Sequence, residues 1–162
     1  MLAAATYFRN FIFGVEDSLV STVGLLSGIA IAGVASETIV LTGAILILVE
    51  AFSMAVGSFL SESSAAEYVS TARTNQRSSY IASVVMFASY FLAGFIPLAP
   101  YMFFAGESAL ALSVACSLLA LFVLGAISGA LSRRGIFTHA LRMMLIGGIA
   151  IAAGVAAGIL LG

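Results

Sequence analysis

The sequence predicts an all-α membrane protein with five transmembrane helices, and two observations support this fold class. Only 8% of the 162 residues are charged, and the mean hydropathy is +1.21, whereas soluble domains carry roughly 25% charged residues. Five apolar stretches also approach the ~20 residues that a helix needs to cross the ~30 Å hydrocarbon core of a bilayer. Because lipid offers no partner for irregular backbone groups, we expect helix nearly throughout.

The first two spans are expected over residues 11–34 and 38–60. No positively charged segment precedes the first apolar residues, so a cleaved secretory signal is not expected. The second span leads into residues 61–78, the longest polar stretch, whose alanine, glutamate and arginine content permits a helical extension. This stretch is too short to form a core of its own. We therefore predict a single transmembrane domain over residues 1–162.

The remaining spans are expected over residues 79–99, 109–132 and 140–162. Pro97 and Pro100 are expected to end the third span, because proline has a fixed φ and no backbone N–H group.

Glycines spaced four residues apart predict places where two helices pack closely, since helices in lipid associate by letting their backbones approach. With sixteen glycines in the chain, such spacings also arise by chance. The pairs are Gly24 and Gly28, Gly125 and Gly129, and Gly154 and Gly158.

The arginines predict the orientation, because cytoplasmic flanks of membrane spans collect positive charge. The six basic residues are Arg9 before the first span, Arg73 and Arg77 between the second and third, and Arg133, Arg134 and Arg142 between the fourth and fifth. The opposite connectors carry only Glu37 and Glu107 as charges. The N-terminus is therefore expected in the cytoplasm and the C-terminus on the other side, in a multi-pass protein whose expected location is a prokaryotic plasma membrane.

Polar side chains form a stripe on the first span. Positions seven apart differ by only about 20° around a helix axis, so Asn10 and Asp17 share a face that Ser21 continues. Glu16 points about 100° away from Asp17, so we expect it to contact another helix or to pair with Arg9. Both carboxylates could instead be solvated at the membrane interface. Because an ionisable group in lipid is costly unless it is paired or lines a wet path, this stripe bears most directly on function.

The second span carries a matching stripe, in which Glu50, Met54, Gly57 and Ser61 follow the spacing of one helix face. A carboxylate and a thioether one turn apart can both reach one bound ion. Hard oxygen ligands bind Fe²⁺ or Mn²⁺ by charge, whereas a methionine sulfur favours a transition metal over Mg²⁺ or Ca²⁺. The metal ligands predicted from the two stripes are Asp17, Met54, Glu50, Asn10, Glu16 and Ser21.

Other functional classes find less support in the residues. The net charge is only −1 and there is no basic stripe, so no nucleic-acid partner is expected. The sequence has no HExxH motif, no plausible Ser–His–Asp set and no phosphate-binding loop, so we expect neither an enzyme nor a bound cofactor. The single histidine, His139, is interpreted as an interfacial residue. One alternative to transport stays open, a non-transporting assembly or scaffold subunit whose carboxylates pair with partner helices.

Two motifs resemble the vacuolar iron transporter family. Residues 10–25 (NFIFGVEDSLVSTVGL) are similar to its first span, and residues 50–61 (EAFSMAVGSFLS) to its second, with weaker likeness up to the run at residues 141–148. The resemblance implies a five-span homodimer with a metal path between the subunits, which carries Fe²⁺ and often Mn²⁺ out of the cytosol in exchange for protons. Asp17 matches the family's first-span aspartate and Met54 its second-span methionine, both of which line that path.

The chain also departs from the family pattern. Ser18 replaces a usual glycine, and Asn10 stands where some members carry a carboxylate. Some members place the second-span acidic residue at the level of Leu46, one turn before Glu50. Residues 61–78 replace a glutamate-rich cytoplasmic domain that collects metal. Either the chain is a short transporter without that domain, in which Asp17 and Glu50 supply charge to the ion and a proton competes with the metal, or its function has drifted from that of the family.

Overall fold

The computed structural model describes residues 2–69, 76–132 and 135–161. Within these residues the chain forms five helices, which confirms the all-α prediction there. They are α1 (Leu2–Ile31), α2 (Ser36–Val69), α3 (Gln76–Phe103), α4 (Gly106–Leu131) and α5 (Ile136–Leu161). Each of the five is long and apolar enough to cross a membrane, so the chain is a multi-pass integral membrane protein.

The helices are longer than the apolar stretches that predicted them. Helix α1 begins at Leu2, so Asp17 lies near the middle of the candidate span Ala4–Ile31 instead of near its start. Helix α2 continues to Val69, as the composition of the polar stretch permits. Arg73, Arg133 and Arg134 lie outside the described residues.

Helix α3 shows that the prediction for Pro97 and Pro100 was wrong, because the helix passes through both prolines and ends at Phe103. The surrounding helices stabilise this segment. Pro97 is fully buried, and the Ser113 hydroxyl of α4 donates a hydrogen bond of 2.7 Å to its carbonyl oxygen. This bond joins α3 to α4 at Pro97, whereas the acceptors that the two prolines leave without a helical N–H donor are the carbonyl groups of Ala93 and Ile96. Membrane helices tolerate proline where neighbouring helices support the segment.

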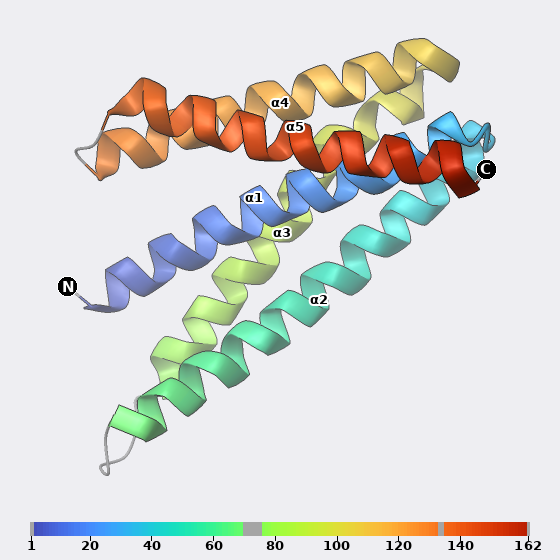
Figure 1. Cartoon of the computed structure of the whole chain (residues 1–162). Helices are drawn as coiled ribbons and strands as arrows, with labels where there is room; N and C mark the ends of the chain where they lie inside the picture. Colours follow the sequence, from blue (N-terminus) through green and yellow to red (C-terminus); the bar gives the residue numbers. More distant parts are fainter. Residues whose placement is uncertain (1, 70–75, 133–134, 162) are drawn as a thin grey trace.

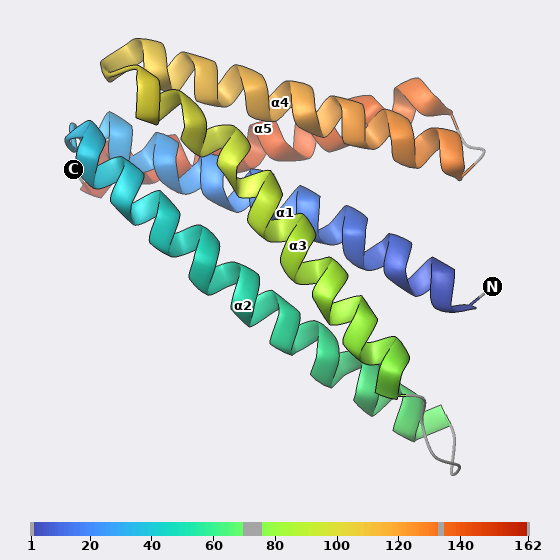
Figure 2. The same ribbon diagram turned by 180° about the vertical axis from the view of Figure 1, so that it is seen from behind.

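The helices form two antiparallel pairs with α1 between them (Figure 1). Helices α2 and α3 make one pair and α4 and α5 the other, and α1 packs mainly against α3 and α5. Helices α1 and α2 meet near their connection and diverge toward their other ends (Figure 2). The first residues of α1, α3 and α5 and the last residues of α2 and α4 lie at one end of the molecule, and the last residues of α5 lie at the other (Figure 1). Arg9, Arg77 and Arg142 belong to helix segments near the first of these ends.

All three glycine pairs lie at helix contacts, as predicted. A Cβ atom on Gly28 would be 2.7 Å from the carbonyl oxygen of Gly154, so the backbones of α1 and α5 touch. A Cβ atom on Gly125 would be 2.7 Å from the carbonyl oxygen of His139, which places α4 equally close to α5. Such contacts are the means by which helices associate in lipid.

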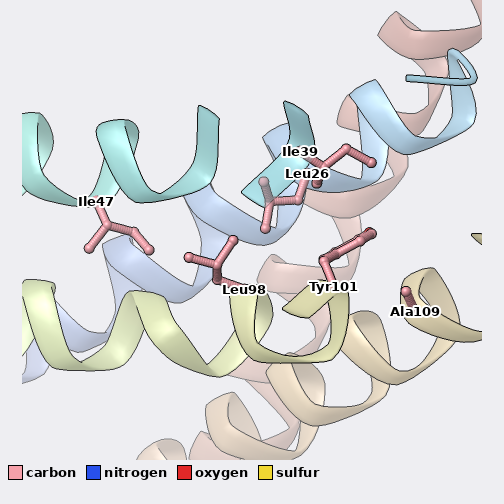
Figure 3. Packing of buried hydrophobic residues seen from close by; sticks show 6 residues of the cluster. All are labelled: Leu26, Ile39, Ile47, Leu98, Tyr101 and Ala109. Carbon is pink, nitrogen blue, oxygen red and sulfur yellow. The ribbon is translucent and has the colours of Figure 1, made fainter. Parts of the chain in front are cut away.

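The main apolar cluster lies between α1, α2, α3 and α4, toward the end where α1 joins α2 (Figure 3). It comprises Leu26, Ile39, Ile47, Leu98, Tyr101 and Ala109. Many other large apolar side chains face outward, among them Leu92, Leu119 and Ile149. An outer surface of this kind suits a lipid environment and leaves the polar groups to the inner faces.

Candidate functional site

The polar stripes of α1 and α2 face each other, and α3 closes the space between them. The polar side chains form two groups, which lie one after the other along the length of α1 and α2. We call the first the α1–α2 chamber, a cavity of about 450 Å³ whose polar and sulfur-bearing lining residues are Arg9, Asn10, Met54, Ser58, Ser61, Glu62 and Met86. We call the second the carboxylate pair, which is Asp17 and Glu50.

Asn10 connects α1 to α2 within the chamber. Its side chain is only 3% exposed. The amide nitrogen donates to the carbonyl oxygen of Thr6 at 2.9 Å, and the amide oxygen accepts from the Ser58 hydroxyl at 2.6 Å. An amide oxygen has two lone pairs, so it can accept from Ser58 and still ligate a cation.

An ion pair between Arg9 and Glu62 lies at the edge of the chamber. The arginine side chain is 69% exposed, whereas the glutamate side chain is 18% exposed. The expectation that Glu16 pairs with Arg9 was therefore wrong. Glu16 lies instead within electrostatic range of Arg142 on α5, and the other expectation, that it contacts another helix, stays a prediction.

The carboxylate pair lies deeper along the two helices. Asp17 and Glu50 are both half-buried, and they are near enough for their negative charges to repel each other. The hydroxyl of Tyr90 on α3 lies within electrostatic range of both carboxylates. It also shares a hydrogen bond of 2.8 Å with the Ser21 hydroxyl. Two carboxylates and two hydroxyls from three helices therefore gather at this level.

Met54 lines the α1–α2 chamber with Asn10, and it stands one helical turn from Glu50. It therefore links the chamber to the carboxylate pair. Among the residues that the structure describes, no three His, Cys, Asp or Glu side chains lie together. A cation here would consequently be held by at most two carboxylates together with neutral oxygen and sulfur atoms.

Helix α3 contributes two residues that the sequence reasoning missed, Met86 and Tyr90. Both are buried, and with Ser79 and Ser83 they recur at the spacing of one helix face. The Ser18 hydroxyl donates to the carbonyl oxygen of Tyr90 at 2.6 Å, which holds α3 against α1 at this level. The same spacing rule that identified the stripe on α2 would have found this face, had tyrosine and methionine been counted with the polar residues.

His139 lies at the contact between α4 and α5. Its Cβ atom and carbonyl oxygen are close to Gly129 and Gly125, respectively. His139 belongs to neither level of the candidate site. Its role in the structure is to pack α4 against α5 at this contact.

The chain is similar to a known protein family. A family model described as VIT family matches residues 8–81 and 69–159, which together cover almost the whole chain. A search of curated proteins found no match.

Proposed function

Because the chain belongs to the VIT family, we propose that it transports a divalent transition-metal ion, Fe²⁺ or Mn²⁺, across its membrane and out of the cytosol. The observation that carries the proposal is the carboxylate pair, two acidic side chains within electrostatic range of each other in the middle of two membrane-spanning helices. Ionisable groups at such depth are costly, and they commonly mark ion pathways.

The carboxylate pair explains how one site can take a metal or a proton. Two like charges that face each other in a poorly solvated place repel, and either a proton or a cation relieves the repulsion. Metal and proton then compete for Asp17 and Glu50, which is the minimal requirement for antiport. The hydroxyls of Ser21 and Tyr90 supply neutral oxygen atoms beside the bound ion.

The path that we propose begins at the end of the molecule where Arg9, Arg77 and Arg142 lie. Cytoplasmic flanks carry positive charge, so this end faces the cytoplasm in our proposal. The ion enters the α1–α2 chamber, passes Asn10 and Met54, reaches the carboxylate pair and leaves at the opposite end. The oxygen donors bind Fe²⁺ or Mn²⁺ by charge, and the thioether adds affinity for Fe²⁺ that Mg²⁺ and Ca²⁺ do not gain.

We also propose that a second copy of the chain completes the path. Helices α1 and α2 diverge at the arginine-bearing end (Figure 2), and the chamber between them is bordered by exposed side chains such as Arg9 and Ser61. A homodimer with its axis at this opening would bring two sets of ligands together and exclude lipid from the path.

Flux measurements in proteoliposomes test the transport proposal. We expect the substitution Asp17→Asn to abolish Fe²⁺ and Mn²⁺ flux driven by a pH gradient, because it removes a charge that both the metal and the proton need. Glu107→Gln, at an exposed position at the far end of the bundle, is the matched control and should transport normally. Unchanged flux in the Asp17→Asn variant would refute the mechanism, and no metal flux in the unmodified protein would favour the scaffold alternative.

A further inference from the structure

The α1–α2 chamber holds donor atoms that the transport proposal does not use. Met86 reaches it from α3 and is only 3% exposed. A Cβ atom placed on Gly14 would lie only 3.1 Å from the Met86 sulfur. The absence of a side chain at Gly14 therefore makes room for the thioether against α1. Gly14 stands one helical turn from Asn10. The chamber is therefore lined by thioether side chains from two helices, Met54 of α2 and Met86 of α3, and by Asn10 of α1.

We propose that the α1–α2 chamber is a cation site in its own right, separate from the carboxylate pair, with Met86 as a ligand and Glu62 as its only source of negative charge. In this site Arg9 is an internal counter-ion that the incoming cation displaces from Glu62. The inference rests on the proposed function, and it names the class of ion that the chamber selects, a softer d-block cation such as Fe²⁺ or Cd²⁺ over the harder Mn²⁺ and Mg²⁺.

The charges of the lining residues support the displacement step. The thioethers, the Asn10 amide and the Ser58 hydroxyl are neutral, so a divalent ion at this position needs a carboxylate nearby. Glu62 is the one carboxylate in the lining, and Arg9 neutralises it. Ion pairs with an exposed partner are weak, and the Arg9 side chain, which lies at the opening of the chamber, can move away from Glu62 while Glu62 stays against the lining.

The donor types support the selectivity. Mg²⁺ and Ca²⁺ take oxygen ligands almost exclusively, whereas thioether sulfur favours softer metals. With two sulfurs and a single carboxylate, the chamber discriminates between cations more by softness than by charge. The carboxylate pair beyond it accepts any divalent ion of suitable size. The chamber is therefore where the chain chooses its ion.

Equilibrium binding to the full-length protein in detergent tests the role of Met86. Cd²⁺ serves as a soft, redox-stable probe and Mn²⁺ as a hard one, both measured by isothermal titration calorimetry. We expect Met86→Leu to weaken Cd²⁺ binding by about tenfold, equivalent to about 1.4 kcal/mol, and to leave Mn²⁺ binding unchanged. Met102→Leu, at an exposed position on the same helix, is the matched control. Equal Cd²⁺ affinity in the Met86→Leu and Met102→Leu variants would overturn the proposal.

The counter-ion role of Arg9 is tested in the same assay and does not depend on how a buried substitution affects folding. Arg9→Gln frees Glu62, so we expect it to tighten Cd²⁺ binding, whereas Glu62→Gln should weaken it. In a Glu62→Gln background the effect of Arg9→Gln should disappear. Weaker Cd²⁺ binding in the Arg9→Gln variant would contradict the displacement step.

The two proposals fail in different ways. Cd²⁺ binding that depends on Met86, in a protein with no metal flux, would refute transport and leave the chamber site standing. Flux that depends on Asp17, with Cd²⁺ binding indifferent to Met86 and Arg9, would refute the chamber site and leave transport standing.

Discussion

Tyr90 is the residue through which α3 takes part in the candidate site. Its ring is fully buried, and its hydroxyl lies beside the carboxylate pair, where it shares a hydrogen bond with Ser21. A hydroxyl in this position can donate to a carboxylate that holds no ion and offer its oxygen to one that does. The sequence marks Tyr90 only as one aromatic residue in an apolar span, and so it does not distinguish this role from packing.

The role of Tyr90 leads to a prediction for Tyr90→Phe, which keeps the ring and removes the hydroxyl. Hydrogen bonds to charged groups are worth about 1.5–3 kcal/mol, so we expect metal flux to fall by about tenfold. Tyr101→Phe is the matched control, since Tyr101 is also buried on α3 but belongs to the apolar cluster. Metal flux is measured for both variants in proteoliposomes. Equal flux in the Tyr90→Phe and Tyr101→Phe variants would contradict a role for the Tyr90 hydroxyl.

Asp17, Glu50 and Asn10 show what residue spacing can predict. Each was assigned to a helix face from the period of its own helix, and these faces do meet in the structure. Partners from other helices could not be predicted in this way. The pairing of Arg9 with Glu62 depends on how far α2 extends beyond the apolar stretch and on its angle to α1, and neither follows from the period of one helix.

At the scale of helices, the close contact of α1 with α5 leads to a prediction for Gly28→Ala. The added Cβ atom would lie 2.7 Å from the carbonyl oxygen of Gly154, and backbone cannot move aside as a side chain can. We expect a loss of about 1–3 kcal/mol in the free energy of unfolding, as for other overpacked contacts. Thermal unfolding in detergent measures this change.

Gly148→Ala is the control for that prediction, because a Cβ atom on Gly148 of α5 would meet no atom within 4 Å. Alanine is the better helix former, so the control should unfold at the same temperature as the unmodified protein or slightly higher. A Gly28→Ala variant as stable as the Gly148→Ala variant would show that α1 and α5 do not touch at this point.

The number of helices and the glycine contacts could be predicted from the sequence, because both depend on composition and local spacing. The course of α3 through Pro97 could not. Proline commonly ends a helix, and here α3 continues because it is buried against α4, where Ser113 donates a hydrogen bond to the Pro97 carbonyl oxygen. The rotation of α3, which turns Met86 and Tyr90 toward α1, likewise depends on contacts between helices.

At the scale of the whole molecule, the arrangement of the helix ends predicts how labels reach the protein. Arg77 lies near one end of the bundle and Glu107 near the other, and both are exposed. In a Cys116→Ala background, we expect Glu107→Cys to react with a membrane-impermeant maleimide in intact cells. Arg77→Cys should react only after the cells are permeabilised, because its end faces the cytoplasm in our proposal. The reverse pattern of labelling would refute the proposed orientation and the direction of export.

The backbone contact between α1 and α5 also limits how the molecule can change shape. Glycines pack against glycines over two helical turns there, so α1 cannot slide or rotate against α5 without separating from it. Helix α1 meets α2 much less extensively, and α2 is held mainly by α3. Helix α1 is also held against α3, by extensive packing and by the Ser18–Tyr90 hydrogen bond. In the transport that we propose, the contact at the site that yields most easily is therefore the one between α1 and α2, and a shift there would change the distance between Asp17 and Glu50.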